Sequence, residues 1–195
     1  MKKFQNFNDT TFIAIDDILK IEWKMFDNTQ NIGGRAECQN NKEEFLLARK
    51  NQFFTWNDDL IKSYLIDLIN ADNRGINLIS QKYAYMMKYT HKEEYDKIKK
   101  YLLPISEFKE KAVDEIAKIQ VMWMEEVIEK YPNINHLRPV HSYEDTEEQT
   151  SFETYLKGEL YSYSDDTIYE YVKYIKELCE INENMQNLLL INSFS

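Results

Sequence analysis

The chain has 195 residues, with 34 Asp and Glu against 24 Lys and Arg, so its formal net charge is −10. This balance argues against binding of nucleic acid or anionic membranes, because both need a surface rich in Lys and Arg. Hydrophobic residues make up 43% of the chain, no apolar run is long enough to cross a bilayer, and there are two cysteines, so we expect a folded cytoplasmic protein with free thiols.

Helical periodicity dominates the N-terminal part of the chain, and glycine and proline are too scarce for an all-β fold. Apolar side chains recur every three to four positions over residues 11–27, which predicts a first helix. A break with two adjacent glycines follows over 28–39. Asn41 then has the properties of an N-cap for a helix to about Trp56, and another helix is expected over 57–71.

The middle of the chain continues this pattern. A helix is expected over 76–89, and Thr90-x-x-Glu93 is typical of a capping box before a short helix to about Leu102. The most regular period runs from Ile105 to Tyr131. It predicts a long helix of about 40 Å.

Residues 133–150 form the one long irregular segment, and they include the acidic run 144–148. After it, Thr150-x-x-Glu153 predicts a capping box for a helix to about Tyr161, and Ser164 is expected to cap one final helix. The sequence therefore predicts a single all-α domain over residues 1–195, a bundle-like array of about six to eight helices.

Several stretches carry a resemblance to a known family. They are Glu22-Trp23-x-Met25-Phe26, Asn31-x-Gly33-Gly34-Arg35-Ala36-x-Cys38-Gln39, Gln52-x-x-x-Trp56, Ser63-Tyr64, Asn77-Leu78, Lys82-Tyr83-Ala84-x-Met86-Met87 and Glu153-Thr154-Tyr155-Leu156-x-Gly158-Glu159-Leu160-x-x-Tyr163-Ser164. Over nearly its whole length the chain resembles an uncharacterised bacterial family, domain of unknown function 4125. The resemblance implies a bacterial single-domain protein and no particular reaction. The chain departs from the family pattern at Gln81, where the family has an acidic residue, and at Tyr85, where it has a basic one, so neither is given a role.

Glu22 is the most unusual side chain of the first predicted helix. It lies one turn from Ile18, Leu19 and Phe26, so it points with the apolar stripe. A buried carboxylate without a partner is costly. A structural ion pair in the core and a solvated edge of the stripe are the two structural interpretations. The functional one is a ligand-binding carboxylate, or a general acid or base with a raised pKa.

The Gly33-Gly34-Arg35 turn is the second candidate. Adjacent glycines let backbone N–H groups converge on an anion, and Arg35 could bind carboxylate or phosphate through two hydrogen bonds. A plain helix-terminating turn is the alternative, and the glycine spacing fits neither a P-loop nor a dinucleotide fingerprint. Cys38, just after the turn, is either a nucleophile with a lowered thiol pKa or a small core residue.

Polar side chains also lie on inward lines of other predicted helices. Arg49 and Gln52 share a line with Trp56, which either faces a pocket or is the exposed edge of the helix. Tyr155 and Glu159 share a face. The C-terminal tyrosines are expected in the core, with a partner-binding patch as the alternative.

No metal site or cofactor is predicted. Metal sites in helical bundles use Glu-x-x-His, and no histidine of the sequence has a glutamate three positions before it. His136 and His141 lie in the irregular segment, which is poor support for a site.

Three hypotheses for function follow. The first is a protein that binds a small polar or anionic molecule near the Gly33-Gly34-Arg35 turn. Its pocket would comprise Glu22, Arg35, Cys38, Gln39, Arg49, Gln52, Trp56, Asn77, Tyr83 and Glu159. The second is an enzyme using the same pocket, with Glu22 as acid or base and Arg35 as anion clamp. The third is an interaction module using the acidic loop 144–148 or the tyrosine-rich C-terminal helices. A protein partner or a homo-oligomer stays open.

Overall fold

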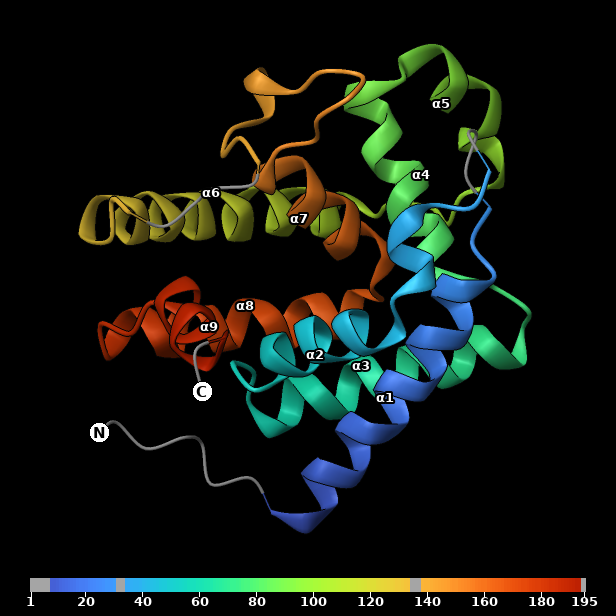
Figure 1. The fold of residues 1–195 in the computed structure, drawn as a ribbon. Coiled ribbons are helices and arrows are strands. Elements are labelled where there is room, and N and C mark those ends of the chain that lie inside the picture. Colours follow the sequence, from blue (N-terminus) through green and yellow to red (C-terminus); the bar gives the residue numbers. More distant parts are fainter. Residues whose placement is uncertain (1–7, 31–33, 134–137, 194–195) are drawn as a thin grey trace.

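The computed structural model describes residues 8–30, 34–133 and 138–193, and within these ranges the fold is all-α (Figure 1). Its helices are α1 (Asp9–Asp27), α2 (Lys42–Phe53), α3 (Asp58–Asn73), α4 (Leu78–Thr90), α5 (Lys92–Ile98), α6 (Glu107–Lys130), α7 (Phe152–Ser162), α8 (Asp165–Glu180) and α9 (Met185–Ser193). Short 3-10 helices are η1 (Glu37–Asn40), η2 (Lys99–Tyr101) and η3 (Ser142–Glu144). No helix in these ranges is long and apolar enough to cross a membrane.

The described ranges hold nine α-helices, so the prediction of six to eight was too low. The additional helix arises because the single C-terminal helix predicted from Ser164 onward is divided into α8 and α9. Asn182 has a φ of 53°, which ends α8, and Glu183 N–H donates to the Leu178 carbonyl at 2.9 Å. Asparagine adopts this left-handed conformation more readily than most residues, so it closes the helix as a glycine would.

Short polar side chains set where most helices begin. In each case the side chain accepts a hydrogen bond from the backbone N–H three residues later, which satisfies a donor that the helix leaves free. The caps are Asn8, Asn41, Asn57, Asn77, Ser106, Ser151 and Ser164. The predicted caps Asn41 and Ser164 are therefore confirmed.

Both predicted capping boxes were wrong. α7 is capped by Ser151 rather than Thr150, and the Glu153 carboxylate accepts a hydrogen bond from Ser142 N–H instead of closing a box. α5 has His91 at its N-cap without a side-chain hydrogen bond, while the Thr90 hydroxyl donates to the Met86 carbonyl of the preceding helix. In each case the side chain expected to close the capping box forms a hydrogen bond with another partner, Ser142 for Glu153 and the Met86 carbonyl for Thr90.

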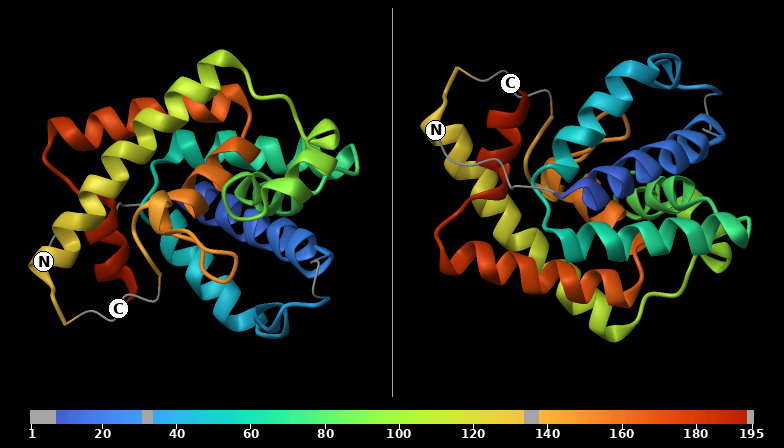
Figure 2. Two further views of the ribbon diagram at one scale, coloured as in Figure 1. Left: turned by 90° about the horizontal axis from the view of Figure 1, so that it is seen from above. Right: turned by 90° about the horizontal axis from the view of Figure 1, so that it is seen from below.

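One buried cluster joins helices from the whole chain. It includes Ile18, Phe53, Leu60, Ile79, Val113, Leu160, Ile168 and Met185. α4 packs against α7, α1 against α3, and α6 against α7, α8 and α9. In both views of Figure 2, α7 lies inside the array with other helices around it. The polar side chains of α7 therefore need partners within the protein.

Candidate functional site

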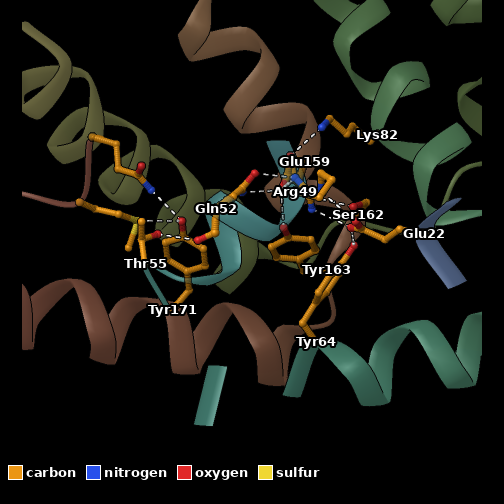
Figure 3. A network of polar contacts seen from close by, with 12 residues as sticks. Glu22, Arg49, Gln52, Thr55, Tyr64, Lys82, Glu159, Ser162, Tyr163 and Tyr171 are labelled. Atoms are coloured by element: carbon orange, nitrogen blue, oxygen red, sulfur yellow. Dashed lines mark hydrogen bonds and ion pairs between the residues drawn. The ribbon is translucent and has the colours of Figure 1, made fainter. Parts of the chain in front are cut away.

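Charged side chains from α1, α2, α4 and α7 meet in the interior (Figure 3). Glu22 is fully buried, and Arg49, Lys82 and Glu159 are exposed by only 7%, 4% and 5%. Two cations and two carboxylates thus compensate one another where little of each side chain is exposed to solvent. A buried charge persists only when it is paired and hydrogen-bonded, so this charge network explains how each member tolerates burial.

Arg49 is the centre of the charge network. Its Nε donates to Glu22 Oε2 at 2.8 Å and its Nη2 donates to Glu22 Oε1 at 2.6 Å, so the two side chains form a bidentate ion pair. Its Nη1 donates to Glu159 Oε1 at 3.0 Å and to Gln52 Oε1 at 2.6 Å. The Tyr64 hydroxyl adds a 2.6 Å hydrogen bond to Glu22 Oε1. Both oxygens of Glu22 are therefore occupied.

Glu159 is equally well paired. Its Oε2 accepts from Lys82 Nζ at 2.6 Å, and its Oε1 accepts from Gln52 Nε2 at 2.9 Å and from the Tyr163 hydroxyl at 2.7 Å. Burial alone would raise the pKa of Glu159, but Arg49 and Lys82 outweigh it and hold that pKa far below its ordinary value. Burial likewise opposes charge on Arg49, yet Glu159 and Glu22 raise its pKa well above normal.

Two cavities border the charge network. The outer cavity, about 660 Å³, is partly open to solvent and is lined by residues of α1, η1, α2, α4, α7 and the segment 138–150. The inner cavity, about 360 Å³, lies toward α6, α8 and α9. Ala48, Arg49, Arg138 and Tyr155 line both cavities. These shared residues form the wall between the two spaces.

Tyr155 lies among cations in this wall. Lys82 Nζ is 3.7 Å and Arg138 Cζ 4.5 Å from the centroid of its ring, distances at which a cation is attracted to an aromatic face. Burial would raise the pKa of Tyr155, but the Lys82 ammonium lowers it overall. The neighbouring Tyr83 has its pKa raised by burial and by Tyr155. Tyr155 thus differs from Tyr83 in having its pKa shifted downward.

Several residues predicted to form a site do come together. Glu22, Arg49, Gln52 and Glu159 are all members of the charge network. The structural interpretation of Glu22 as half of a buried ion pair fits its surroundings, whereas its interpretation as a solvated edge was wrong. The interpretation of Arg49 as part of an exposed edge was wrong as well, because its guanidinium is drawn inward by two carboxylates.

Cys38 and Tyr83 line the outer cavity. Cys38 is exposed, so its interpretation as a small core residue was wrong. It lies in the 3-10 helix η1, where the buried Gln39 is the residue that faces the core.

The other predicted residues stabilise the surroundings of the site and line neither cavity. Gln39 Nε2 donates to the carbonyls at the end of α1, at 2.7 and 2.9 Å. Asn77 caps α4 and donates to the Met25 carbonyl at 2.7 Å. Trp56 is fully buried, with its ring 5.7 Å from that of Tyr64.

The glycine turn is only partly described. Gly33 and His136 lie outside the described residues, and Gly34 has a φ of +90°. Arg35 is exposed, and its Nη2 binds Asp27 at 2.6 Å and the Gln39 carbonyl at 2.5 Å. Arg35 thus ties the turn to the end of α1. In the part of the chain that the structure describes, no cluster of His, Cys, Asp and Glu is suited to hold a metal.

The sequence reasoning missed Lys82 and Arg138 as site residues, and it left Tyr155 out of the predicted pocket. Lys82 had a usable signal, because it lies one turn from Ile79 and Met86 on the apolar stripe of α4. Tyr155 shared a face with Glu159. Arg138 lies in irregular backbone, where no periodicity indicates which way a side chain points.

Comparison with protein-family models matches residues 13–194 to the family described as a protein of unknown function (DUF4125). Searches of curated proteins and of solved structures gave no match. The matched range includes the whole charge network and both cavities, and it confirms the resemblance carried by the sequence motifs. The chain belongs to the DUF4125 family of proteins of unknown function.

Proposed function

We propose that the protein binds a small carboxylate in the outer cavity, with Arg138 as its counter-ion. The observation that carries this proposal is that the Arg138 guanidinium forms no ion pair with any residue in 8–30, 34–133 or 138–193. Arg138 also lines both cavities, and its guanidinium lies over the ring of Tyr155. A guanidinium offers a planar fork of donors that matches a carboxylate.

The lining of the outer cavity supports a ligand of moderate size with an apolar body. Its volume lies within the usual range for small-molecule sites. Phe26 and Phe45 stack with ring centroids 4.5 Å apart, and both contribute to the lining together with Met86. An aliphatic or aromatic group is therefore favoured beside the charged end.

The charges around the outer cavity favour one negative charge over several. Glu44 and Glu148 also line it, and like charges placed close together are unfavourable. Arg49, in the shared wall, already donates hydrogen bonds to Glu22, Gln52 and Glu159. A single carboxylate facing Arg138 suits this balance better than a polyphosphate.

In this proposal Glu22 has a positioning role. It lies behind the wall, fully buried, and fixes the guanidinium of Arg49. The alternative in which Glu22 acts as acid or base gains no support from the geometry, because its oxygens are bound to Arg49 and Tyr64.

The interaction-module alternative has less support. Tyr161, Tyr163, Tyr171 and Tyr174 are at most 3% exposed, so they offer little surface to a partner. Within the acidic loop, Asp145 accepts hydrogen bonds from Ser151 N–H and the Thr154 hydroxyl. The two unpaired cysteines support a reducing, cytoplasmic location as part of the proposal.

The test compares wild type with Arg138→Gln by isothermal titration with benzoate, hexanoate and phenylpyruvate. We expect the variant to lose roughly tenfold in affinity or more, about 1.4 kcal/mol. Arg74→Gln is the matched control, because Arg74 is an exposed arginine at the end of α3 and outside both cavities. Equal affinity of wild type and Arg138→Gln, or no binding of any of the three probes together with no small molecule retained in native mass spectrometry, would overturn the proposal.

A further inference from the structure

We infer that Tyr155 exchanges a proton with a carbon atom of the small molecule whose carboxylate is bound in the outer cavity. The site is then catalytic. This inference rests on the proposed function and adds a reaction class to it. The substrate would carry a C–H made acidic by an adjacent carbonyl group, as in a 2-oxo acid. As the phenolate, Tyr155 Oη takes that proton and becomes the phenol, the electron pair of the broken C–H bond stays on the substrate as an enolate, and the phenol then returns a proton to the substrate and becomes the phenolate again.

The position of Tyr155 is the first argument. Its side chain is partly exposed and belongs to the wall shared by both cavities, on the same wall as Arg138. A ligand whose carboxylate meets Arg138 thus lies beside the Tyr155 ring, since the guanidinium is 4.5 Å from the ring centroid. A proton-transfer group must be within reach of the bound molecule, and Tyr155 lies in the lining that such a molecule would contact.

The second argument is the cation held beside the phenol. Lys82 is only 4% exposed, and its ammonium lies 2.6 Å from Glu159 Oε2 and 3.7 Å from the Tyr155 ring centroid. Glu159 is itself fixed by Arg49 and Tyr163. The Lys82 ammonium is therefore held in place, and its positive charge stays close to the Tyr155 ring.

Charged and titratable groups on three helices surround Tyr155. From α4, Lys82 lowers its pKa, and Tyr83 interacts electrostatically with it. Arg49 of α2 also lowers this pKa, Glu159 on its own helix raises it, and burial raises it. The balance lowers the pKa of Tyr155 from its ordinary value, and Arg138 places a further cation over the ring. The same cations would stabilise the enolate formed on the substrate.

A purely structural role for Tyr155 makes a different prediction. If the ring only packs between cations, removing its hydroxyl while keeping the ring leaves every property of the bound ligand unchanged. Tyr155→Phe is therefore the informative variant, because phenylalanine keeps the aromatic face that Lys82 and Arg138 contact.

The first experiment measures deuterium uptake at the β-carbon of phenylpyruvate in D₂O by NMR. We expect wild type to speed this exchange over buffer, and Tyr155→Phe to lose roughly 100-fold of that rate while still binding phenylpyruvate. Tyr169→Phe, which removes an exposed tyrosine outside both cavities, should keep the wild-type rate. If wild type binds phenylpyruvate without speeding exchange, the inference fails and the proposed function stands. If wild type binds none of the three probes, the inference fails, and the proposed function fails with it when native mass spectrometry also finds no retained small molecule.

The second experiment needs no variant. An aryl sulfonyl fluoride reacts with a phenolate, whose oxygen attacks sulfur and displaces fluoride. A lowered pKa raises the fraction of the phenol that is ionised at a given pH. We expect Tyr155, although less exposed, to be sulfonylated severalfold faster than Tyr169, as measured by peptide mass spectrometry. A rate at Tyr155 that does not exceed the rate at Tyr169 overturns the inference.

Discussion

At the scale of single residues, the stability of the site depends on pairing every buried charge. Glu22 and Arg49 are joined by two hydrogen bonds, and Lys82 and Glu159 by one. Loss of one partner leaves the other charged in a medium that solvates it poorly. The same pairs fix the side chains that border the cavities, so stability and site geometry are linked.

The contrast between Glu22 and Arg35 provides a prediction. Glu22→Ala leaves the Arg49 guanidinium without its two-pronged partner, so we expect a loss of about 3–5 kcal/mol in the free energy of unfolding. Arg35→Ala removes an ion pair between half-exposed side chains and should cost about 1 kcal/mol. Urea unfolding of both variants measures the difference, and equal losses would contradict the assignment of Glu22 as a buried anchor.

The lowered pKa of Glu159 predicts a pH dependence. Its pKa in the folded protein lies below the unfolded value of about 4.3, so the ionised carboxylate stabilises the fold fully above that pH. This stabilisation is lost as the pH falls toward the folded pKa. Between about pH 5 and pH 2 we expect the free energy of unfolding to fall less steeply in Glu159→Gln than in wild type. Equal slopes in chemical unfolding would show that Glu159 does not titrate as the geometry requires.

The sequence alone indicated part of this site. Glu22 and Arg49 were found because a polar side chain on an apolar stripe is visible within one helix. Their pairing was not predictable, because 27 positions separate them and helical periodicity carries no information about which helices touch. Arg138 was missed for a related reason. Its side chain is placed by irregular backbone, where no repeat applies.

At the scale of elements, the contact between α4 and α7 places Lys82 beside Glu159 and Tyr155. Gly158 makes the close approach of these helices possible. A Cβ atom at this position would lie 2.9 Å from the Lys82 carbonyl oxygen and 2.5 Å from Met86 Cγ. The absence of a side chain at Gly158 therefore sets the distance across which the Lys82 ammonium acts.

Gly158→Ala tests this contact. Alanine favours a helix by about 1 kcal/mol over glycine, so a solvent-exposed position would gain stability. Here the carbonyl of Lys82 is backbone and cannot rotate away, so we expect a net loss of about 1–3 kcal/mol. Sulfonylation of Tyr155 should slow as well, because α7 is pushed away from Lys82. A variant as stable as wild type in urea would show that α4 and α7 have room to separate.

Helix existence was more predictable than helix boundaries. Apolar periods and N-cap patterns together identified every segment in which the described residues form an α-helix, including the long α6. The division between α8 and α9 was missed, since a single Asn182 in a left-handed conformation leaves the hydrophobic pattern unbroken. Boundaries depend on hydrogen bonds of one or two side chains, as at Ser151, whereas existence depends on a pattern spread over many.

At the scale of the whole molecule, many of the acidic side chains have a structural role. Acidic side chains stand in the first turns of several helices, where they interact favourably with the helix dipole. They include Glu43, Glu44, Asp58, Asp59, Asp165 and Asp166. Part of the net charge of −10 therefore stabilises helix N-termini.

The arrangement of helices predicts that the chain unfolds as one cooperative unit. α2 contacts α9 and α3 contacts α8, so the N-terminal and C-terminal parts share one buried cluster rather than forming separate cores. Trp23, Trp56 and Trp123 lie in α1, between α2 and α3, and in α6, so tryptophan fluorescence reports on distant parts of that cluster. In a urea titration we expect fluorescence and far-ultraviolet circular dichroism to change with the same midpoint, as two-state unfolding requires. Two separate midpoints would mean that part of the array folds independently, and the single-domain prediction would then be wrong.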